Sequence, residues 1–521
     1  MMDWHTMSST DRALTCVDIL DEVFERVIRM DDAKADSDHR HHVGRRALAH
    51  CARVCKVFFK PAVRVLWARL DSVLPLFHTL PSLKSYDRNV RPRRTYHLPD
   101  QVASYEWDRL RTYAVYVKNI CVGKAPCART ESFTRASWTS LQRLAHNQPI
   151  CPNLRHLSWG MDEAPPDDLI TFLGPSIVAL RITCFAGRFT LDEYSWQVHL
   201  RILFRAVSER ATRLQGLWIF LGDVMTPSQV TIPLSQISLP ALRSCLLRCG
   251  KVTFSDLVML SGVAALESLE LTLDNGILQS EDIHCSLEFQ RLHTLWVRHL
   301  PTSISASISL FKCSPIRSLY VHGIEYRDPA ALKRMFEAWS YDFPSLQLLS
   351  CKICMPNIPV RPAGLLSSFL APSLRNLSGL RAVDLYLGGI PGLTIDDSDI
   401  VMLSELWPLL KQLRLWAAKD ETAGHTYGLL SLAALAKNCP HLEDLLLQRI
   451  VIRPEDTARL PTGLPLHGLR SLQVSPPNRI ARHDYVTIRE RIFPHLPHPR
   501  EEDMEELSGL AHASELPMNV G

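Results

Sequence analysis

One short pattern of hydrophobic and polar positions, apolar-x-x-apolar-x-apolar, recurs thirteen times between residues 117 and 474. The copies occupy residues 117–122, 154–159, 177–182, 214–219, 242–247, 266–271, 292–297, 316–321, 346–351, 380–385, 410–415, 442–447 and 469–474. The first and last copies start 352 residues apart over twelve steps, so the pattern recurs about every 29 residues. A unit of this size cannot bury its apolar face alone, so neighbouring units must stack into one array.

This pattern and period are typical of the leucine-rich repeat, whose units each give a short strand and a returning helix. We therefore predict an α/β solenoid over residues 113–476, with parallel strands on its concave face and helices on its convex face. Proline stands two residues before several copies, where it ends the preceding helix and favours extended backbone, at Pro152, Pro240, Pro344 and Pro440. Helices are expected between strands, for example over residues 200–213, 330–341 and 429–438.

The alternation of a strand decides which side chains leave the core of such an array. If the apolar positions face inwards, the third, fifth and seventh positions face the concave side. Many of these positions hold Trp, Tyr or Arg, the residue types most common in binding hot spots. The predicted protein-docking residues are Trp218, Phe220, Arg248, Trp296, Arg298, Tyr320, His322, Tyr386, Arg414 and Trp416. The alternatives are that long loops cover some of these aromatic side chains, or that a strand is shifted in register.

Residues 13–70 show a helical pattern instead. Ile19, Leu20, Val23, Phe24 and Val27 form one apolar stripe at helical spacing. A polar stretch over residues 31–46 is expected to be a loop, and a second helix follows it. A third helix is expected to begin at Pro61, because proline is tolerated at the first helical position.

The remaining segments flank these two parts. Residues 1–12 are expected to be a disordered leader, and residues 71–112 a connector with a helix that caps the first repeat. Residues 477–521 are expected to be a C-terminal cap followed by an acidic tail.

Three segments of the N-terminal part carry a family resemblance. Residues 15–24 are similar to the family motif Leu-Pro-x-Glu-Ile-Leu-x-x-Ile-Phe, with Thr15-Cys16 in place of Leu-Pro. Residues 49–58 are similar to Leu-x-x-Cys-x-x-Val-Cys-(Lys/Arg)-x-(Trp/Phe), and residues 61–70 to the Leu-Trp segment that ends the third helix of the family. With the repeats, the chain resembles fungal F-box proteins that carry leucine-rich repeats, over about residues 14–476.

The resemblance implies a substrate-receptor subunit of a Skp1–cullin–F-box ubiquitin ligase. The helices would bind the Skp1 adaptor, and through it a cullin, while the solenoid would hold a protein target. The adaptor contacts carried over from the family are Ile19, Leu20, Val23, Phe24, Val54, Cys55, Phe58, Leu66 and Trp67. Two alternatives stay open: these residues are only the core of a small bundle, or the whole chain is a repeat scaffold or inhibitor without a ligase role.

Composition narrows the range of partners. The net charge of +4 over 521 residues gives no basis for nucleic-acid binding, and the basic run 88–94 fits a solvated linker. No segment approaches the roughly 18 uninterrupted apolar residues of a membrane span, and the N-terminus lacks an apolar stretch of signal-peptide type. Fourteen scattered cysteines, some at core positions such as Cys245 and Cys351, indicate a reducing intracellular compartment, cytoplasmic or nuclear.

No catalytic or cofactor motif is present. Phosphate-binding, dinucleotide-binding, zinc-protease and nucleophile-elbow patterns are all missing, so we expect neither enzymatic activity nor a cofactor. His39, His41, His42 and His50 lie close together in sequence, but the first three occupy a polar loop without fixed geometry. Cys351 and Cys354 form a C-x-x-C pair without a second pair at zinc-ribbon spacing. We therefore expect no metal site.

Overall fold

The computed structural model describes most of the chain between residues 16 and 497. The described residues are 16–33, 43–87, 94–99, 101–122, 132–161, 167–184, 193–221, 234, 238–248, 252–272, 286–298, 308–325, 329–354, 364–365, 373–387, 393–416, 427–447, 450, 452, 454–461, 464, 467–474 and 482–497. The expected leader, the loop histidines His39, His41 and His42, residues 88–93 of the basic run and the acidic tail lie outside them. The chain divides into two compact units, Met1–Leu242 and Arg243–Gly521.

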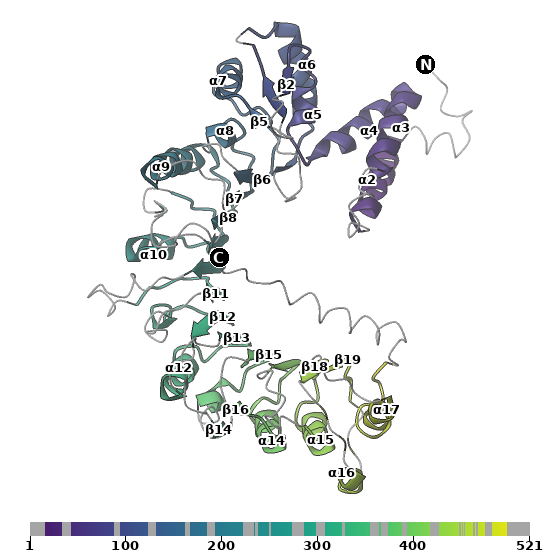
Figure 1. Cartoon of the computed structure of the whole chain (residues 1–521), viewed down its shortest axis with the longest axis vertical. Coiled ribbons are helices and arrows are strands. Elements are labelled where there is room, and N and C mark those ends of the chain that lie inside the picture. The colour runs from purple at the N-terminus through teal and green to yellow at the C-terminus, as the bar shows by residue number, and fades with distance from the viewer. Residues whose placement is uncertain are drawn as a thin grey trace. The chain divides into compact units, whose positions relative to one another are not determined.

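Parallel strands form the framework of each unit (Figure 1). In the first unit they pair in the order β1 (Arg69–Leu70), β4 (Asn119–Val122), β6 (His156–Met161), β7 (Ala179–Cys184) and β8 (Gly216–Leu221). In the second unit the order is β9 (Ser244–Arg248), β10 (Ser268–Thr272), β11 (Thr294–Arg298), β12 (Ser318–Glu325), β13 (Leu348–Cys354), β15 (Ala382–Tyr386), β17 (Gln412–Trp416), β18 (Asp444–Leu447) and β19 (Ser471–Val474).

These strands confirm the predicted leucine-rich-repeat fold. Each of the thirteen repeated segments contains one strand, and every strand begins at the third position of its copy. Strand β1 is an addition that the pattern did not predict, because Arg69 and Leu70 directly follow the third helix and carry no repeat signature.

Helices flank and connect the strands, and within each unit the helices between β4 and β19 lie on one side of the parallel strands (Figure 1). Those of the first unit are α2 (Val17–Ala33), α3 (Val43–Val54), α4 (Lys56–Ala68), α5 (Leu74–Phe77), α6 (Ser104–Ala114), α7 (Arg135–Leu144), α8 (Asp167–Ile170) and α9 (Glu193–Arg210). Those of the second unit are α10 (Phe254–Ser261), α12 (Pro329–Asp342), the 3-10 helix η4 (Arg375–Leu377), α14 (Asp397–Leu406), α15 (Leu429–Asn438), α16 (Pro454–Ala458) and α17 (Arg482–Arg491).

The first, fourth and sixth positions of the repeats make the core. Leu269, Leu295, Leu319 and Leu413 are fully buried in the second unit, and Leu217 is fully buried in the first. Core positions also hold buried thiols, as predicted: burial raises the pKa of Cys245 to about 12 and shifts the pKa of Cys351 in the same direction. These thiols pack as small hydrophobic groups and are poor nucleophiles.

Within each unit, backbone hydrogen bonds tie each repeat to the next. The carbonyl oxygen at the second position of a copy accepts the N–H groups of the second and third positions of the following copy. Thus the Arg243 carbonyl accepts from Glu267 and Ser268 at 2.8 and 3.0 Å, and the His293 carbonyl accepts from Arg317 and Ser318, both at 2.8 Å. The same arrangement recurs in the first unit at Arg155. This ladder extends the strand pairing and keeps neighbouring copies in register.

The N-terminal helices α2, α3 and α4 contact one another and enclose a small core. Leu20, Phe24, Leu48, Ala62 and Val65 are buried in it. The structure corrects two boundaries: α2 and α3 extend into the stretch expected to be a loop, and α4 begins at Lys56 rather than at Pro61.

The predicted connector contains more structure than its proline content suggested. Strands β2 (Lys84–Asp87), β3 (Arg94–His97) and β5 (Ser132–Phe133) form a separate small sheet, with β2 and β3 antiparallel. The predicted capping helix is α6. In the second unit, two-residue strands β14 (Gly364–Leu365) and β16 (Leu393–Thr394) also pair. At the end of that unit, Phe493 beyond α17 packs edge-on against His467 with ring centroids 5.2 Å apart.

The stacked core makes a quantitative prediction. Leu295→Ala should destabilise the second unit by about 2–5 kcal/mol, because it removes fully buried methyl groups and leaves a cavity. Urea unfolding followed by circular dichroism measures the loss. Tyr341→Ala is the control, since that side chain is 85% exposed and should shift stability by no more than about 0.5 kcal/mol. Equal effects of the two substitutions would contradict the assigned core.

Candidate protein-docking surfaces

The strand register of the second unit aligns outward-facing side chains in two rows. The fifth positions place Glu270, Trp296, Tyr320 and Ser350 side by side on β10 to β13. The seventh positions place Arg298, His322, Lys352, Tyr386 and Trp416 side by side on β11, β12, β13, β15 and β17. The predicted residues of the second unit therefore share one face of it, as the alternation required. We use "central patch" for Arg248, Glu270, Trp296, Arg298, Tyr320, His322, Ser350 and Lys352.

An aromatic platform lies in the middle of the central patch. The rings of Trp296 and Tyr320 stack with centroids 3.7 Å apart and an interplanar angle of 11°. The His322 ring lies 5.5 Å from that of Trp296. All three side chains are half-buried, so their neighbours hold them in place while part of each ring stays accessible.

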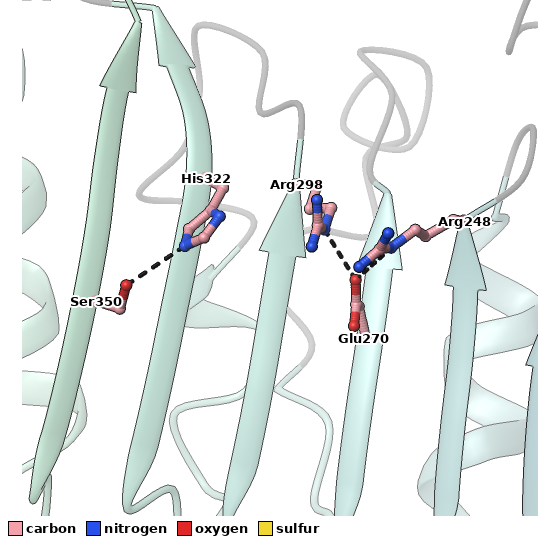
Figure 2. A network of polar contacts seen from close by, with 5 residues as sticks. All are labelled: Arg248, Glu270, Arg298, His322 and Ser350. Carbon is pink, nitrogen blue, oxygen red and sulfur yellow. Dashed lines mark hydrogen bonds and ion pairs between the residues drawn. The ribbon is translucent and has the colours of Figure 1, made fainter. Parts of the chain in front are cut away.

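Two arginines share one carboxylate beside this platform (Figure 2). The Nε atoms of Arg248 and Arg298 both donate to Oε1 of Glu270, at 2.6 and 2.8 Å. Glu270 is buried, and the Arg298 guanidinium also lies 5.9 Å from the Trp296 ring. One negative charge therefore positions two positive ones.

His322 lies between further cations. Its Nε2 is 3.3 Å from the Ser350 hydroxyl, as Figure 2 shows. Burial lowers the pKa of His322, and the positive charges of Arg298 and Lys352 lower it further, against a smaller opposing effect of Glu270. Lys352 is exposed, and its ammonium lies 5.1 Å from the Tyr386 ring.

The same face continues over β15 to β18 with a more balanced charge. Arg414 Nη2 lies 2.8 Å from Asp444, which also accepts a hydrogen bond from Gln412. Asp384 is the register partner of Arg414, and burial raises the pKa of its carboxyl while Arg414 lowers it. The rings of Tyr386 and Trp416 lie 6.4 Å apart.

The first unit carries a smaller group of outward-facing aromatic residues. The Arg181 guanidinium lies 4.5 Å above the Phe220 ring. The Trp218 ring folds back over Gly216, where a Cβ atom would collide with it, so glycine at this position allows that orientation. Both aromatic side chains are half-buried.

The candidate adaptor residues separate into two groups. Leu20 and Phe24 are buried in the core of the helical module, and Phe58 and Leu66 pack against that core. Ile19, Val23, Val54 and Cys55 are exposed; the fractions are 47%, 47% and 69% for the three aliphatic residues. Ile19 and Val23 are four residues apart on α2 and so lie on the same helical face.

The ninth candidate, Trp67, has a different neighbour. Its ring stacks on Tyr113 of α6 with centroids 4.8 Å apart. The N–H of Lys118 donates to the Ala68 carbonyl at 2.9 Å, and Arg45 pairs with Asp71 at 2.8 Å. Trp67 thus belongs to the junction that joins the helical module to the first repeat.

Several residues of these surfaces were missed by the sequence-based prediction. Glu270, Ser350, Lys352 and Asp384 occupy the same fifth and seventh positions as the predicted residues. The prediction selected aromatic residues and arginine by type, so a rule based on position alone would have found them. The exposed Val57 and Phe59 of α4 were also missed.

No metal centre or membrane span emerges from the described part of the chain. No cluster of three or more His, Cys, Asp and Glu side chains there could hold a metal ion. None of the helices described is long and apolar enough to cross a membrane.

Comparison with known proteins adds little to this geometry. No family model and no curated protein matches the sequence. Similar solved structures include an internalin from Listeria monocytogenes, which is 13% identical with a TM-score of 0.32. The match covers 77% of this chain and 93% of the internalin chain. Another is TLR13 in a complex with ssRNA13, which is 14% identical with a TM-score of 0.33. The match covers 77% of this chain and 60% of the TLR13 chain. At these values the assignment of the fold rests on the strand register itself.

The electrostatics of the central patch can be tested by titration. The pKa of His322 in the folded protein should lie below the ordinary value of 6.5 for an imidazole. Its ring should therefore become protonated only at a pH lower than that at which a free imidazole does. Because the unfolded chain would bind this proton first, His322 lowers the free energy of unfolding as pH falls from 6.5 through the folded pKa.

Replacing a positively charged neighbour of His322 by a neutral residue should raise the pKa of the imidazole. Lys352→Gln removes a positive charge and should raise the pKa of His322, measured by NMR titration of the imidazole protons. Lys312→Gln, an exposed residue in the connection between β11 and β12, is the matched control and should leave the pKa unchanged. A His322 pKa above 6.5 in the unmodified protein would contradict the arrangement described.

Proposed function

We propose that this chain is a substrate-receptor subunit of a Skp1–cullin–F-box ubiquitin ligase. The helices α2 to α4 bind a Skp1-like adaptor, and through it a cullin, while the repeats hold a protein target. The observation that carries the proposal is the exposure of Ile19, Val23 and Val54 on a module whose own core is already filled. The resemblance to fungal F-box proteins supplies the identity of the adaptor.

Exposed aliphatic side chains on a small helical module favour a protein partner. A module of about 50 residues has little apolar surface to spare, so apolar residues that it leaves in water are costly unless a partner covers them. Val17, Val43, Val57 and Phe59 of the same three helices are also at least 40% exposed. The four candidates that form the core, Leu20, Phe24, Phe58 and Leu66, hold the helices in place and so position the exposed ones.

The repeats fit the target-holding role. Their outward-facing rows combine stacked aromatic rings with charged groups that neighbouring strands fix in position, which is the composition of binding hot spots. A row of strands about 4.8 Å apart gives an extended surface better matched to a protein than to a metabolite.

A second function remains in competition, a repeat scaffold or inhibitor with no ligase role. One observation favours it: Trp67 stacks on Tyr113, and the helical module is joined to β4 through the Ala68 carbonyl and strand β1. By these contacts the module could act solely as a cap for the first repeat, since terminal repeats need such covers.

Co-purification with a Skp1 homologue distinguishes the two functions. The unmodified chain should co-purify with it, and Ile19→Asp combined with Val54→Asp should weaken the complex by at least about tenfold, because two exposed apolar contacts become charged. Both positions are solvent-exposed, so the helical module should stay folded. Val258→Asp on α10, an exposed valine at 46%, is the control and should co-purify normally. A chain that does not bind the homologue, or a double variant that binds it as well as the control does, would reject the receptor function in favour of the scaffold.

A further inference from the structure

We propose that the central patch of the second unit binds an extended acidic segment of the target protein. The proposal names the chemistry of the target and rests on the target-holding function above. It commits to carboxylate side chains of an unmodified polypeptide as the recognised groups.

The charges of the patch carry the argument. Arg248, Arg298 and Lys352 bring three positive charges to the eight residues of the patch, and Glu270 brings one negative charge. Asp384, the register partner of Ser350, borders the patch, and burial raises the pKa of its carboxyl. The Glu270 carboxylate already pairs with both arginines, at 2.6 and 2.8 Å. A protein surface that concentrates cations of this kind attracts and orients a segment of opposite charge.

The spacing of the cations suits an extended chain. Arg298, His322 and Lys352 are register partners on three consecutive strands. Strands are about 4.8 Å apart, so the row is about 10 Å long, and alternate side chains of an extended peptide are about 7 Å apart. Two or three acidic side chains from five consecutive residues can therefore reach the row together.

The aromatic platform strengthens these ion pairs. Trp296 and Tyr320 lie directly beside the cationic row, and Lys352 lies over the Tyr386 ring. A peptide backbone that packs on these rings displaces water from around the charged groups. Ion pairs gain strength when water is excluded from them, whereas the same pairs on an open surface contribute little.

His322 would report occupancy of the patch. The groups that face it are Arg298 on β11, Lys352 on β13, Glu270 on β10 and Arg248 on β9. Burial and the three cations lower the pKa of its ring, and Glu270 opposes them. A bound carboxylate adds the opposite charge and raises the pKa of the imidazole. Binding therefore couples to proton uptake, and affinity should increase as the pH falls.

The test uses the full chain and synthetic peptides. The probe is a fluorescein-labelled dodecapeptide of alternating Glu and Ser, and its neutral counterpart has Gln in place of every Glu. Fluorescence anisotropy measures the affinity of each peptide. The acidic peptide should bind, the neutral one should not, and the affinity should fall as the salt concentration rises.

Substitutions locate the binding in the patch. Lys352→Gln should weaken the acidic peptide about two- to fivefold, and adding His322→Asn and Trp296→Ala should weaken it at least tenfold. These side chains are half-buried or exposed, and thermal unfolding checks that the variants stay folded. Lys312→Gln is the charge-matched control and should bind normally. In the unmodified chain, the NMR titration of His322 should shift to a higher pKa when the acidic peptide is added.

Four results would overturn the proposal. If the neutral peptide bound as tightly as the acidic one, the patch would not recognise the negative charge of its ligand. Binding of the neutral peptide carrying one phosphoserine ten times more tightly than the acidic one would assign the patch to a phosphorylated segment. A twelve-residue oligothymidylate that binds as tightly would assign it to nucleic acid.

The fourth result concerns the chain's own acidic residues. If Gln replaced Glu501, Glu502, Glu505 and Glu506 and peptide affinity rose tenfold, the occupant would be the chain's own tail. None of these measurements includes the adaptor. Loss of Skp1 co-purification with retained peptide binding would therefore reject the ligase function alone.

Discussion

A single repeat of about 29 residues, one strand and one helix, cannot bury its own leucine side chains, and the structure of both units depends on this constraint. Leu269, Leu295 and Leu319 are excluded from water by the copies on either side of them. Within each unit, the second-position carbonyl of one copy accepts two N–H groups of the next, so stacking also satisfies the backbone where the strands begin. The interior thus requires neighbours, and the neighbours must lie in one register.

The outward-facing rows of side chains in the second unit are a consequence of that register. A strand that buries alternate residues must present the others, and partners at equal positions then lie about 4.8 Å apart. Trp296 can stack on Tyr320, and Glu270 can bind two arginines, because β9 to β12 hold equal positions side by side. These rows depend on the same stacking that builds the core, while the N-terminal module depends on its own packing of Leu20 and Phe24.

The sequence predicts the elements that follow from the regular spacing of apolar residues. It does not predict those that depend on tertiary contacts between distant segments. The thirteen strands follow from the recurring apolar positions, and α15 coincides with its expected bounds, residues 429–438. Strand β1 and the β2-β3-β5 sheet carry no period, so only their partners reveal them. In the helical module, the family resemblance implied Leu20 and Ile19 alike as adaptor contacts. Burial separates them, because which face of α2 meets α4 is a tertiary property.

Cross-linking across two strands tests the register most directly. Thr294 and Ser318 are Cα partners on β11 and β12, small residues on the outward face. Parallel strands are about 4.8 Å apart, within the 4.4–6.8 Å that a disulfide spans, whereas Thr294 and Tyr320 are offset by two residues and about 8 Å. Under mild oxidation, mass spectrometry should find a disulfide in the Thr294→Cys/Ser318→Cys variant and little in Thr294→Cys/Tyr320→Cys. A preference for the offset pair, or no disulfide in either, would contradict the stacked register.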